Sequence, residues 1–369
     1  MPVTARPGVQ VAVERLEVTA YTIPLEEPES DGTLEWDSLT CVVVRAHGGG
    51  ETGLGYTYGA DSIAHFVRSK LAEQVEGADA FSPQSAWASM QRAIRNFGQE
   101  GLGAMAVSAV EIALWDLKAR LLGVALADLL GRFHGEVPVY GSGGFTSYSN
   151  ARMREQLGTW VHELGIPRVK IKVGRQPEQD PPRLREARQE IGDEVELFVD
   201  ANGAFTRKQA LRWAERYAEL GVSYLEEPVS SDDREGLRLV RDHGPAGVDI
   251  AAGEYAWGLR DLSELVDCVD VLQADVTRCG GVTNMLRADG ICRSRSLPFS
   301  AHCAPAVSAH VCAAMECARH IEYFHDHVRA EKLLFDGTLE PSGGALRPDS
   351  SRPGLGLELK EADARRYEA

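Results

Sequence analysis

The chain has 369 residues, of which 44% are hydrophobic and 25% charged, and its formal net charge is −16. This length allows two domains, or one large barrel with additions, and the composition is that of a soluble globular protein. The negative charge argues against a nucleic-acid partner and against binding to an anionic membrane surface. No apolar run is long enough to span a bilayer, and the N-terminus has no apolar signal core. We therefore expect a cytoplasmic protein.

The seven cysteines are scattered along the chain, and none forms a CxxC pair. Disulfide frameworks and structural zinc sites use more regular spacings. Reduced and mostly buried thiols are the favoured interpretation, which agrees with a cytoplasmic location.

The first part of the chain, residues 1–135, reads as a sheet followed by helices. Alternating hydrophobicity predicts strands over 11–21, 40–46 and 52–59, and helical periodicity follows over 63–74, 83–97 and 104–122. Residues 23–38 contain Pro24, Pro28, Gly32 and six acidic residues, so we predict a loop there. This pattern indicates an α+β domain.

After Gly135 the pattern changes to alternating strands and helices. Strand signals recur every 20 to 30 residues or so, which is the period of a βα unit, and a closed parallel barrel over 136–336 accounts for them most simply. The strand candidates lie at 137–140, 168–174, 195–203, 224–228, 248–254, 271–275, 298–302 and 321–323. Residues 337–369 are rich in Gly and Pro and contain little core, so we expect this tail to pack back on the first domain.

Ionisable side chains stand at the ends of seven consecutive strand candidates. Active sites of (β/α) barrels lie at these carboxyl ends. Each residue alone has a structural explanation, but seven strands that all end in an ionisable residue indicate a common site. Charges that converge in such a site must be paired or bound to metal. In chain order they are Lys170 and Lys172, then Asp200, Glu226, Glu254, Asp275, His302 and Glu322.

The residue types suggest how this site is divided. Asp200, Glu226 and Glu254 on neighbouring strands suit a hard divalent cation such as Mg²⁺, which takes oxygen ligands. Burial, the nearby metal ion and mutual repulsion lower the pKa of the two lysines, so we expect one of them to act as a base near neutral pH. His302 beside Asp275 is the arrangement of an imidazole base held by a carboxylate.

The order and spacing of these motifs resemble the enolase superfamily, and within it the mandelate racemase subgroup. The resemblance covers nearly the whole chain. The matching segments are Lys170-x-Lys172, Asp200-Ala201-Asn202-Gly203, Leu225-Glu226-Glu227-Pro228, Gly253-Glu254, Asp275 with the later Gly280-Gly281-Val282-Thr283, Ser300-x-His302, and Glu322. It implies a modified TIM barrel of the (β/α)7β type with an N-terminal α+β capping domain that the C-terminal tail completes.

The resemblance also implies roles for the residues. Asp200, Glu226 and Glu254 are expected to bind one Mg²⁺ per subunit, which stabilises the enediolate formed when the proton α to a substrate carboxylate is removed. Lys172 is expected to be the base on one face, and the His302–Asp275 pair serves the other.

Further contacts follow from the same resemblance. Lys170 and Glu322 are expected to contact the substrate carboxylate, and Asn202 and Ser142 are further candidate contacts. We interpret Glu227 as a structural partner of the metal site. An even-numbered homo-oligomer is also expected.

The capping domain resembles the family's specificity lid, with lid loops at about 22–36 and 52–62. Trp36, Tyr56 and Tyr58 are the candidates for closing over a ligand, and we interpret the acidic residues of the first lid loop as solvated. The run His325-Asp326-His327 has no evident third metal ligand and reads as a loop near the barrel mouth.

Bases on both faces allow more than one reaction. Acid-sugar dehydration to a 2-keto-3-deoxy sugar acid is the favoured prediction, because it is the more common outcome in the family. Racemisation or epimerisation of a 2-hydroxy acid is the alternative. A barrel that binds a carboxylate without turnover is disfavoured, because a binding protein needs no paired bases.

Overall fold

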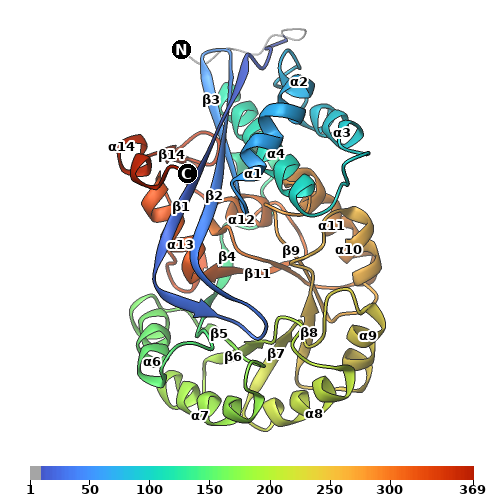
Figure 1. Cartoon of the computed structure of the whole chain (residues 1–369), viewed down its shortest axis with the longest axis vertical. Helices are drawn as coiled ribbons and strands as arrows, with labels where there is room; N and C mark the ends of the chain where they lie inside the picture. The colour runs from blue at the N-terminus through green and yellow to red at the C-terminus, as the bar shows by residue number, and fades with distance from the viewer. Residues whose placement is uncertain (1–9) are drawn as a thin grey trace.

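The computed structural model describes residues 10–369, and Figure 1 shows a capping domain of sheet and helices above a barrel. The capping sheet is antiparallel with strand order β1-β2-β3. Its strands are β1 (Arg15–Ser30), β2 (Glu35–Gly48) and β3 (Glu51–Tyr58). The helices that follow are α1 (Ser62–Phe66), a π-helical turn (Val67–Leu71), α2 (Ala72–Val75), α3 (Pro83–Ala93), α4 (Leu102–Leu122) and α5 (Leu126–Leu130).

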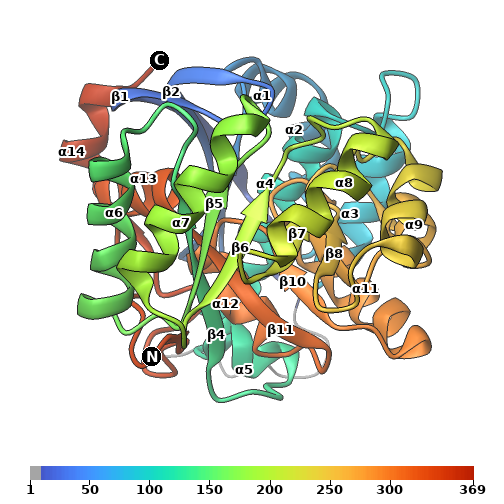
Figure 2. The ribbon, with the colours of Figure 1, turned by 90° about the horizontal axis from the view of Figure 1, so that it is seen from below.

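The barrel has eight parallel strands in chain order and closes where β11 pairs with β4. Seven helices connect the eight strands, so the predicted (β/α)7β barrel is confirmed. The strands are β4 (Val137–Gly143), β5 (Arg168–Lys172), β6 (Glu196–Asp200), β7 (Val222–Glu226), β8 (Asp249–Ala252), β9 (Val271–Ala274), β10 (Phe299–Ala301) and β11 (Ala318–Phe324). The connecting helices are α6 (Asn150–Gly158), α7 (Asp180–Ile191), α8 (Arg207–Ala218), α9 (Arg234–His243), α10 (Leu259–Leu265), α11 (Val282–Arg295) and α12 (Pro305–Cys312). The view from below in Figure 2 shows these helices outside the strands.

The prediction of a loop over 23–38 is wrong, because this segment forms most of a long hairpin. β1 runs to Ser30, and β2 begins at Glu35. Pairing shifts register between Pro24 and Glu29 and then resumes with Glu29 opposite Trp36. Prolines are tolerated here because β1 is an edge strand, where a missing N–H removes no essential ladder bond. The hairpin extends from the capping domain across the mouth of the barrel (Figure 1).

Helix α4 packs closely against β3 because two glycines lie at the contact. A Cβ atom on Gly55 would lie 2.3 Å from the carbonyl oxygen of Ala109, and one on Gly53 would lie 2.2 Å from that of Ala113. The helix ends where predicted, with Gly123 in the left-handed conformation at φ 70°.

A small aromatic layer fills the inside of the barrel beneath the site. The rings of Phe198 and Tyr224 stack with centroids 4.6 Å apart, and Tyr140 packs edge-on against Phe198. These side chains are buried together with Ala251 and Val271. The barrel interior is therefore a packed core that closes the site from below.

The tail contacts both parts of the protein. β13 (Ala345–Leu346) pairs with β4, and β14 (Glu358–Leu359) pairs with β12 (Phe335–Asp336), which follows α13 (His325–Leu334). The backbone N–H of Leu355 donates to Asp116 of α4, and the N–H of Ala369 donates to the carbonyl of Ala20 in β1. The chain ends with α14 (Glu361–Ala364) and a 3-10 turn.

All seven cysteines are free. Within residues 10–369, no helix combines the length and apolar character needed to cross a membrane.

Candidate active site

Three carboxylates meet at the carboxyl ends of neighbouring barrel strands. Asp200 and Glu226 are the last residues of β6 and β7, where they pair in register, and Glu254 follows β8. One oxygen of each lies within 4.8 Å of the others, and all three side chains are buried. Oε1 of Glu226 has no hydrogen-bond partner. An all-oxygen cluster with a buried unpartnered atom fits a hard divalent cation.

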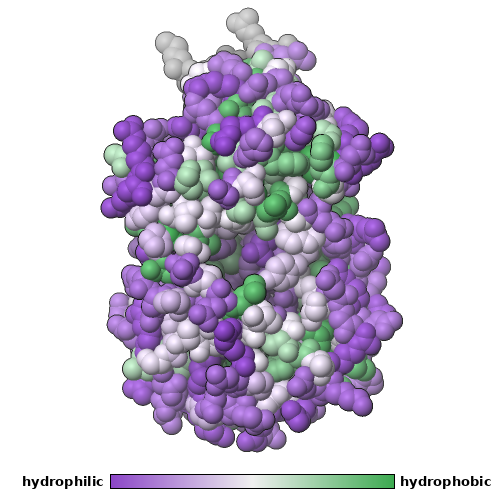
Figure 3. Space-filling model, viewed as in Figure 1, coloured by the Kyte–Doolittle hydropathy of each residue, from purple (hydrophilic) through white to green (hydrophobic). Residues whose placement is uncertain are grey.

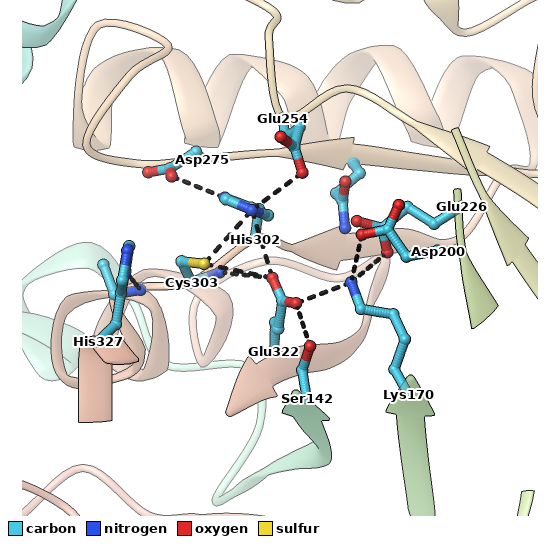
Figure 4. A network of polar contacts seen from close by, with 12 residues as sticks. Ser142, Lys170, Asp200, Glu226, Glu254, Asp275, His302, Cys303, Glu322 and His327 are labelled. Carbon is cyan, nitrogen blue, oxygen red and sulfur yellow. Dashed lines mark hydrogen bonds and ion pairs between the residues drawn. The ribbon is translucent and has the colours of Figure 1, made fainter. Parts of the chain in front are cut away.

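The two lysines of β5 occupy different depths. Nζ of Lys172 lies 2.5 Å from Oδ2 of Asp200, and the side chain borders the cavity above. Nζ of Lys170 lies 2.6 Å from Glu226 and 2.7 Å from Glu322, and its side chain has no exposed surface (Figure 4). Lys170 therefore lies beneath the carboxylates and does not face the cavity.

The charges that the chain itself supplies act against the predicted lowering of the lysine pKa, which included the charge of a bound metal ion. Burial lowers the pKa of Lys172, but the negative charges of Asp200, Glu254 and Glu322 together raise it above its ordinary value. Burial likewise lowers the pKa of Lys170, while Glu226 and Glu322 raise it well above that value. Because the prediction was made for a site with a metal ion bound, it stays a prediction.

His302 and Asp275 form the predicted pair. Nδ1 of His302 lies 2.8 Å from Oδ2 of Asp275, whose other oxygen accepts from the backbone and hydroxyl of Thr277. Nε2 of His302 is 3.1 Å from Glu254 and 3.5 Å from Glu322. Burial lowers the pKa of His302, but the neighbouring acidic groups raise it overall. The imidazole thus has one nitrogen fixed and the other directed at the carboxylate cluster.

Glu322 connects the histidine side of the site to the lysine side. Its Oε1 accepts from Ser142 at 2.6 Å, and its Oε2 accepts from the backbone of Cys303 at 3.3 Å. Ser142 and Glu322 are both fully buried. Ser142 therefore contacts Glu322, not the cavity.

A cavity of about 220 Å³ lies above these groups. Figure 3 shows a hollow near the middle of the face that is also seen in Figure 1. Predicted residues that line it are Trp36, Lys172, Asn202, Glu254 and His302. The other lining residues are Asp31, Leu34, Ser38, Leu39, Tyr255, Arg278, Cys303, Phe324, Asp326 and His327. The volume lies below the roughly 300–1,000 Å³ of drug-sized pockets, which suits a small ligand.

Residues 16–131 match the family model for the mandelate racemase / muconate lactonizing enzyme N-terminal domain, and residues 152–363 match the enolase C-terminal domain-like model. The chain belongs to the enolase superfamily, in its mandelate racemase group. The family that the sequence motifs resemble is thereby confirmed.

Several relatives of this superfamily member are known. A 3,6-anhydro-alpha-L-galactonate cycloisomerase of Streptomyces coelicolor is 30% identical over 94% of this chain and 97% of its own length. A mandelate racemase/muconate lactonizing enzyme-like protein from Rubrobacter xylanophilus has a solved structure with 68% identity and a TM-score of 0.96, covering 97% of this chain and 100% of that one. The L-talarate/galactarate dehydratase of Salmonella typhimurium, solved with Mg and L-lyxarohydroxamate, is 27% identical with a TM-score of 0.90, over 99% and 95% of the two chains.

These relatives are enzymes, and we conclude that this superfamily member is an enzyme too. Magnesium is present in the solved dehydratase and in a solved racemase from Streptomyces coelicolor A3(2). The oxygen-only cluster of Asp200, Glu226 and Glu254 fits the same ion.

The lid of this enolase superfamily member differs from the prediction at Tyr58. Tyr58 does not line the cavity, because it is buried and stacks on His327 with ring centroids 3.6 Å apart. Tyr56 is also buried and donates its hydroxyl to Glu331. β3 is covered by α4 on one side, and its Tyr56 and Tyr58 pack against α13 and Phe335, which the local sequence does not reveal.

The acidic hairpin also differs in part from the predicted solvated loop. Glu26, Glu27 and Glu35 are exposed as expected, but Glu29 and Asp31 are buried. Oδ1 of Asp31 accepts from the backbone N–H groups of two residues in the hairpin turn, so this carboxylate shapes the tip of the hairpin.

Arg278 and Cys303 are two of the cavity residues that the sequence analysis missed. Arg278 lies 3.6 Å from both Glu254 and Asp275, and its position three residues after Asp275 was the available signal. Sγ of Cys303 lies 3.3 Å from Nε2 of His302. Cys303 has a φ of 51°, and Asn202 has a φ of 45°. Such non-glycine conformations occur preferentially at functional sites.

Proposed function

We propose that this enzyme dehydrates a small acid sugar to a 2-keto-3-deoxy acid, with Mg²⁺ as cofactor. The observation that carries the proposal is the placement of two proton-transfer groups on one cavity. Lys172 contacts the carboxylate cluster at Asp200, and His302 contacts it at Glu254. The substrate carbon between them would be reached from two sides.

The chain's residues divide the reaction between them. Asp200, Glu226 and Glu254 would hold the magnesium ion. Its positive charge would stabilise negative charge on the substrate carboxylate and would lower the pKa of the lysine, which favours the unprotonated amine. Lys172 removes the proton from the carbon α to that carboxylate.

His302 completes the elimination on the other side. Its Nδ1 is held by Asp275, so its Nε2 carries the proton given to the hydroxyl group that leaves from the β-carbon as water. The enol product then takes a proton at the β-carbon and becomes the 2-keto-3-deoxy acid. The raised pKa of His302 is the direction that a proton donor needs.

The remaining predicted residues have supporting roles in this proposal. Lys170, Glu322 and Ser142 are buried beneath the cluster, where they balance charge and hold the carboxylates in place. Asn202 and Trp36 line the cavity and would contact the substrate.

Racemisation or epimerisation is the second candidate, and one observation favours it. Because Lys172 and His302 lie at different ends of the carboxylate cluster, one could remove a proton and the other return it from the opposite face. Racemisation needs no leaving group on the β-carbon, whereas dehydration needs a hydroxyl group there. The identity of the substrate therefore distinguishes the two reactions.

A screen of acid sugars and 2-hydroxy acids with Mg²⁺, read as semicarbazone formation, tests the proposal. We expect keto acid from at least one acid sugar, and none from Lys172→Ala or His302→Asn. Inverted hydroxy acid without keto acid would instead assign the enzyme as a racemase or epimerase. Full activity of both variants on the wild-type substrate would contradict both schemes.

A further inference from the structure

A second group of metal-binding residue types lies where the hairpin meets the barrel, outside the carboxylate cluster described above. Glu29 lies near the end of β1, and His325 and Asp326 begin α13. One ligand atom of each lies within 4.8 Å of the others. The sequence offered no third ligand for the His325-Asp326 run, because Glu29 is almost 300 residues away in the chain.

Each of the two carboxylates has one oxygen held by the protein and one left free. Oε1 of Glu29 accepts from the Tyr148 hydroxyl at 2.7 Å, and Oδ2 of Asp326 accepts from Nε1 of Trp36 at 3.0 Å. Oε2 of Glu29 and Oδ1 of Asp326 are buried without a hydrogen-bond partner. Ligating carboxylates show this pattern, in which an outer donor orients the group and the free oxygen meets the ion.

The charges of this group also call for a cation. Glu29 is 3% exposed and Asp326 is 2% exposed. Two adjacent buried carboxylates repel each other unless a cation offsets their charge or they share a proton.

The third group supplies a nitrogen ligand. The half-buried His325 offers a ring nitrogen close to both carboxylates, and neutral imidazole is a common metal ligand. His327, the next histidine, is not part of the group, because it stacks on Tyr58 and its Nδ1 accepts from the backbone of Ala304. One imidazole and two carboxylates suit Zn²⁺ and related transition ions better than Mg²⁺.

We propose that Glu29, His325 and Asp326 bind a divalent transition-metal ion of the Zn²⁺ type that fastens the hairpin to the mouth of the barrel. The ion joins a residue of β1 to two residues of α13. Trp36 and Asp326 also line the active-site cavity, so the ion holds one wall of that cavity in place. This site is separate from the magnesium site and does not depend on which reaction the enzyme catalyses.

Cobalt binding to the full-length chain tests the proposal, because Co²⁺ reports its ligands by visible absorption. The variant Asp200→Asn disables the magnesium site, and we expect it to bind one Co²⁺ per chain without a thiolate-to-cobalt band. Adding Glu29→Gln should weaken this binding by more than about tenfold, since even outer partners of a metal site contribute that much. The matched control Glu35→Gln changes an exposed acid of the same hairpin and should leave binding unchanged.

Three results would overturn the proposal. Unchanged Co²⁺ affinity after Glu29→Gln would show that Glu29 is not a ligand of the ion. A thiolate-to-cobalt band would place the ion at the alternative cluster of His302, Cys303 and Glu322. No Co²⁺ uptake by the folded Asp200→Asn chain would mean that Glu29 and Asp326 share a proton. If Glu29→Gln does not fold by circular dichroism, the half-buried His325→Asn gives the same comparison.

Discussion

Lys170 and Lys172 are two residues apart on one strand, but their surroundings assign them different tasks. Lys172 borders the cavity and contacts Asp200, whereas Lys170 is enclosed by Asp200, Glu226 and Glu322. Removing one member of a buried ion pair leaves a charge without a partner, which costs about 3–5 kcal/mol.

Lys170→Met should therefore destabilise the fold by several kcal/mol, on the order of the cost of breaking a buried ion pair. Lys172→Ala should have a smaller effect on stability, because its side chain borders the cavity, but it should abolish turnover. Denaturant unfolding and activity, measured on both variants, test this separation. Equal losses of stability in the two would contradict it.

Asp275→Asn should lower kcat by about 10²–10⁴, the usual contribution of positioned acid–base catalysis. The amide keeps the shape of the carboxylate but removes the charge that holds Nδ1 of His302 and raises its pKa. Magnesium affinity, measured by calorimetry, should change little, because Asp275 is not part of the carboxylate cluster. Wild-type kcat would show that the His302–Asp275 pair has no part in proton transfer.

The position of the candidate site residues was predictable from the sequence because strand periodicity and βα spacing place them at one end of the barrel. The alternation around Lys170 and Lys172 fixed their strand, and the acidic ends of the next three strands fixed the metal cluster. How deeply each side chain is buried below the cavity was not predictable. Whether Lys170 or Tyr58 reaches the cavity depends on side chains that arrive from distant segments.

At the level of elements, the hairpin β1–β2 was the largest error, because its prolines and acids are typical of loops. The structure places the irregular residues at a register shift on an edge strand, where pairing can resume beyond them. Two of the acids then become buried against the barrel. Composition alone could not distinguish this hairpin from a solvated loop, since the stabilising contacts lie in α6, α13 and their flanking loops.

The contact between β3 and α4 can be tested with two glycine substitutions. Gly55→Ala should destabilise the protein by at least about 1–3 kcal/mol, because the new methyl group meets the backbone of α4 and overpacks the contact. Gly290→Ala in α11 should stabilise it by about 0.5–1 kcal/mol, because the position is helical, exposed and open. Thermal unfolding compares the two, and a neutral Gly55→Ala would contradict the close packing.

At the level of the whole molecule, one contribution to the pH dependence of stability comes from a buried, neutral histidine between α12 and α5. His310 of α12 accepts from the backbone of Ala127 in α5, and burial lowers its pKa to about 4. The unfolded chain takes up this proton near pH 6.5, so the contribution is complete above that pH and is lost as the pH falls toward 4. The pKa difference corresponds to about 3 kcal/mol.

The unfolding free energy of wild type relative to that of His310→Gln should therefore decrease as the pH falls from 6.5 to 4. The exposed His65→Gln is the matched control and should leave the slope of unfolding free energy against pH unchanged. An equal slope in wild type and His310→Gln would assign the acid sensitivity to other groups.

The most direct measurement is exchange of the substrate's α-hydrogen with solvent, followed by NMR in D₂O with Mg²⁺ and the acid sugar found in the screen. We predict that the wild-type enzyme removes this hydrogen, so that product or returned substrate carries the label, and that Lys172→Ala does not. Product formation by Lys172→Ala at the wild-type rate, or a wild-type enzyme that binds the acid without touching this hydrogen, would contradict a site built to take a proton from the carbon beside a carboxylate.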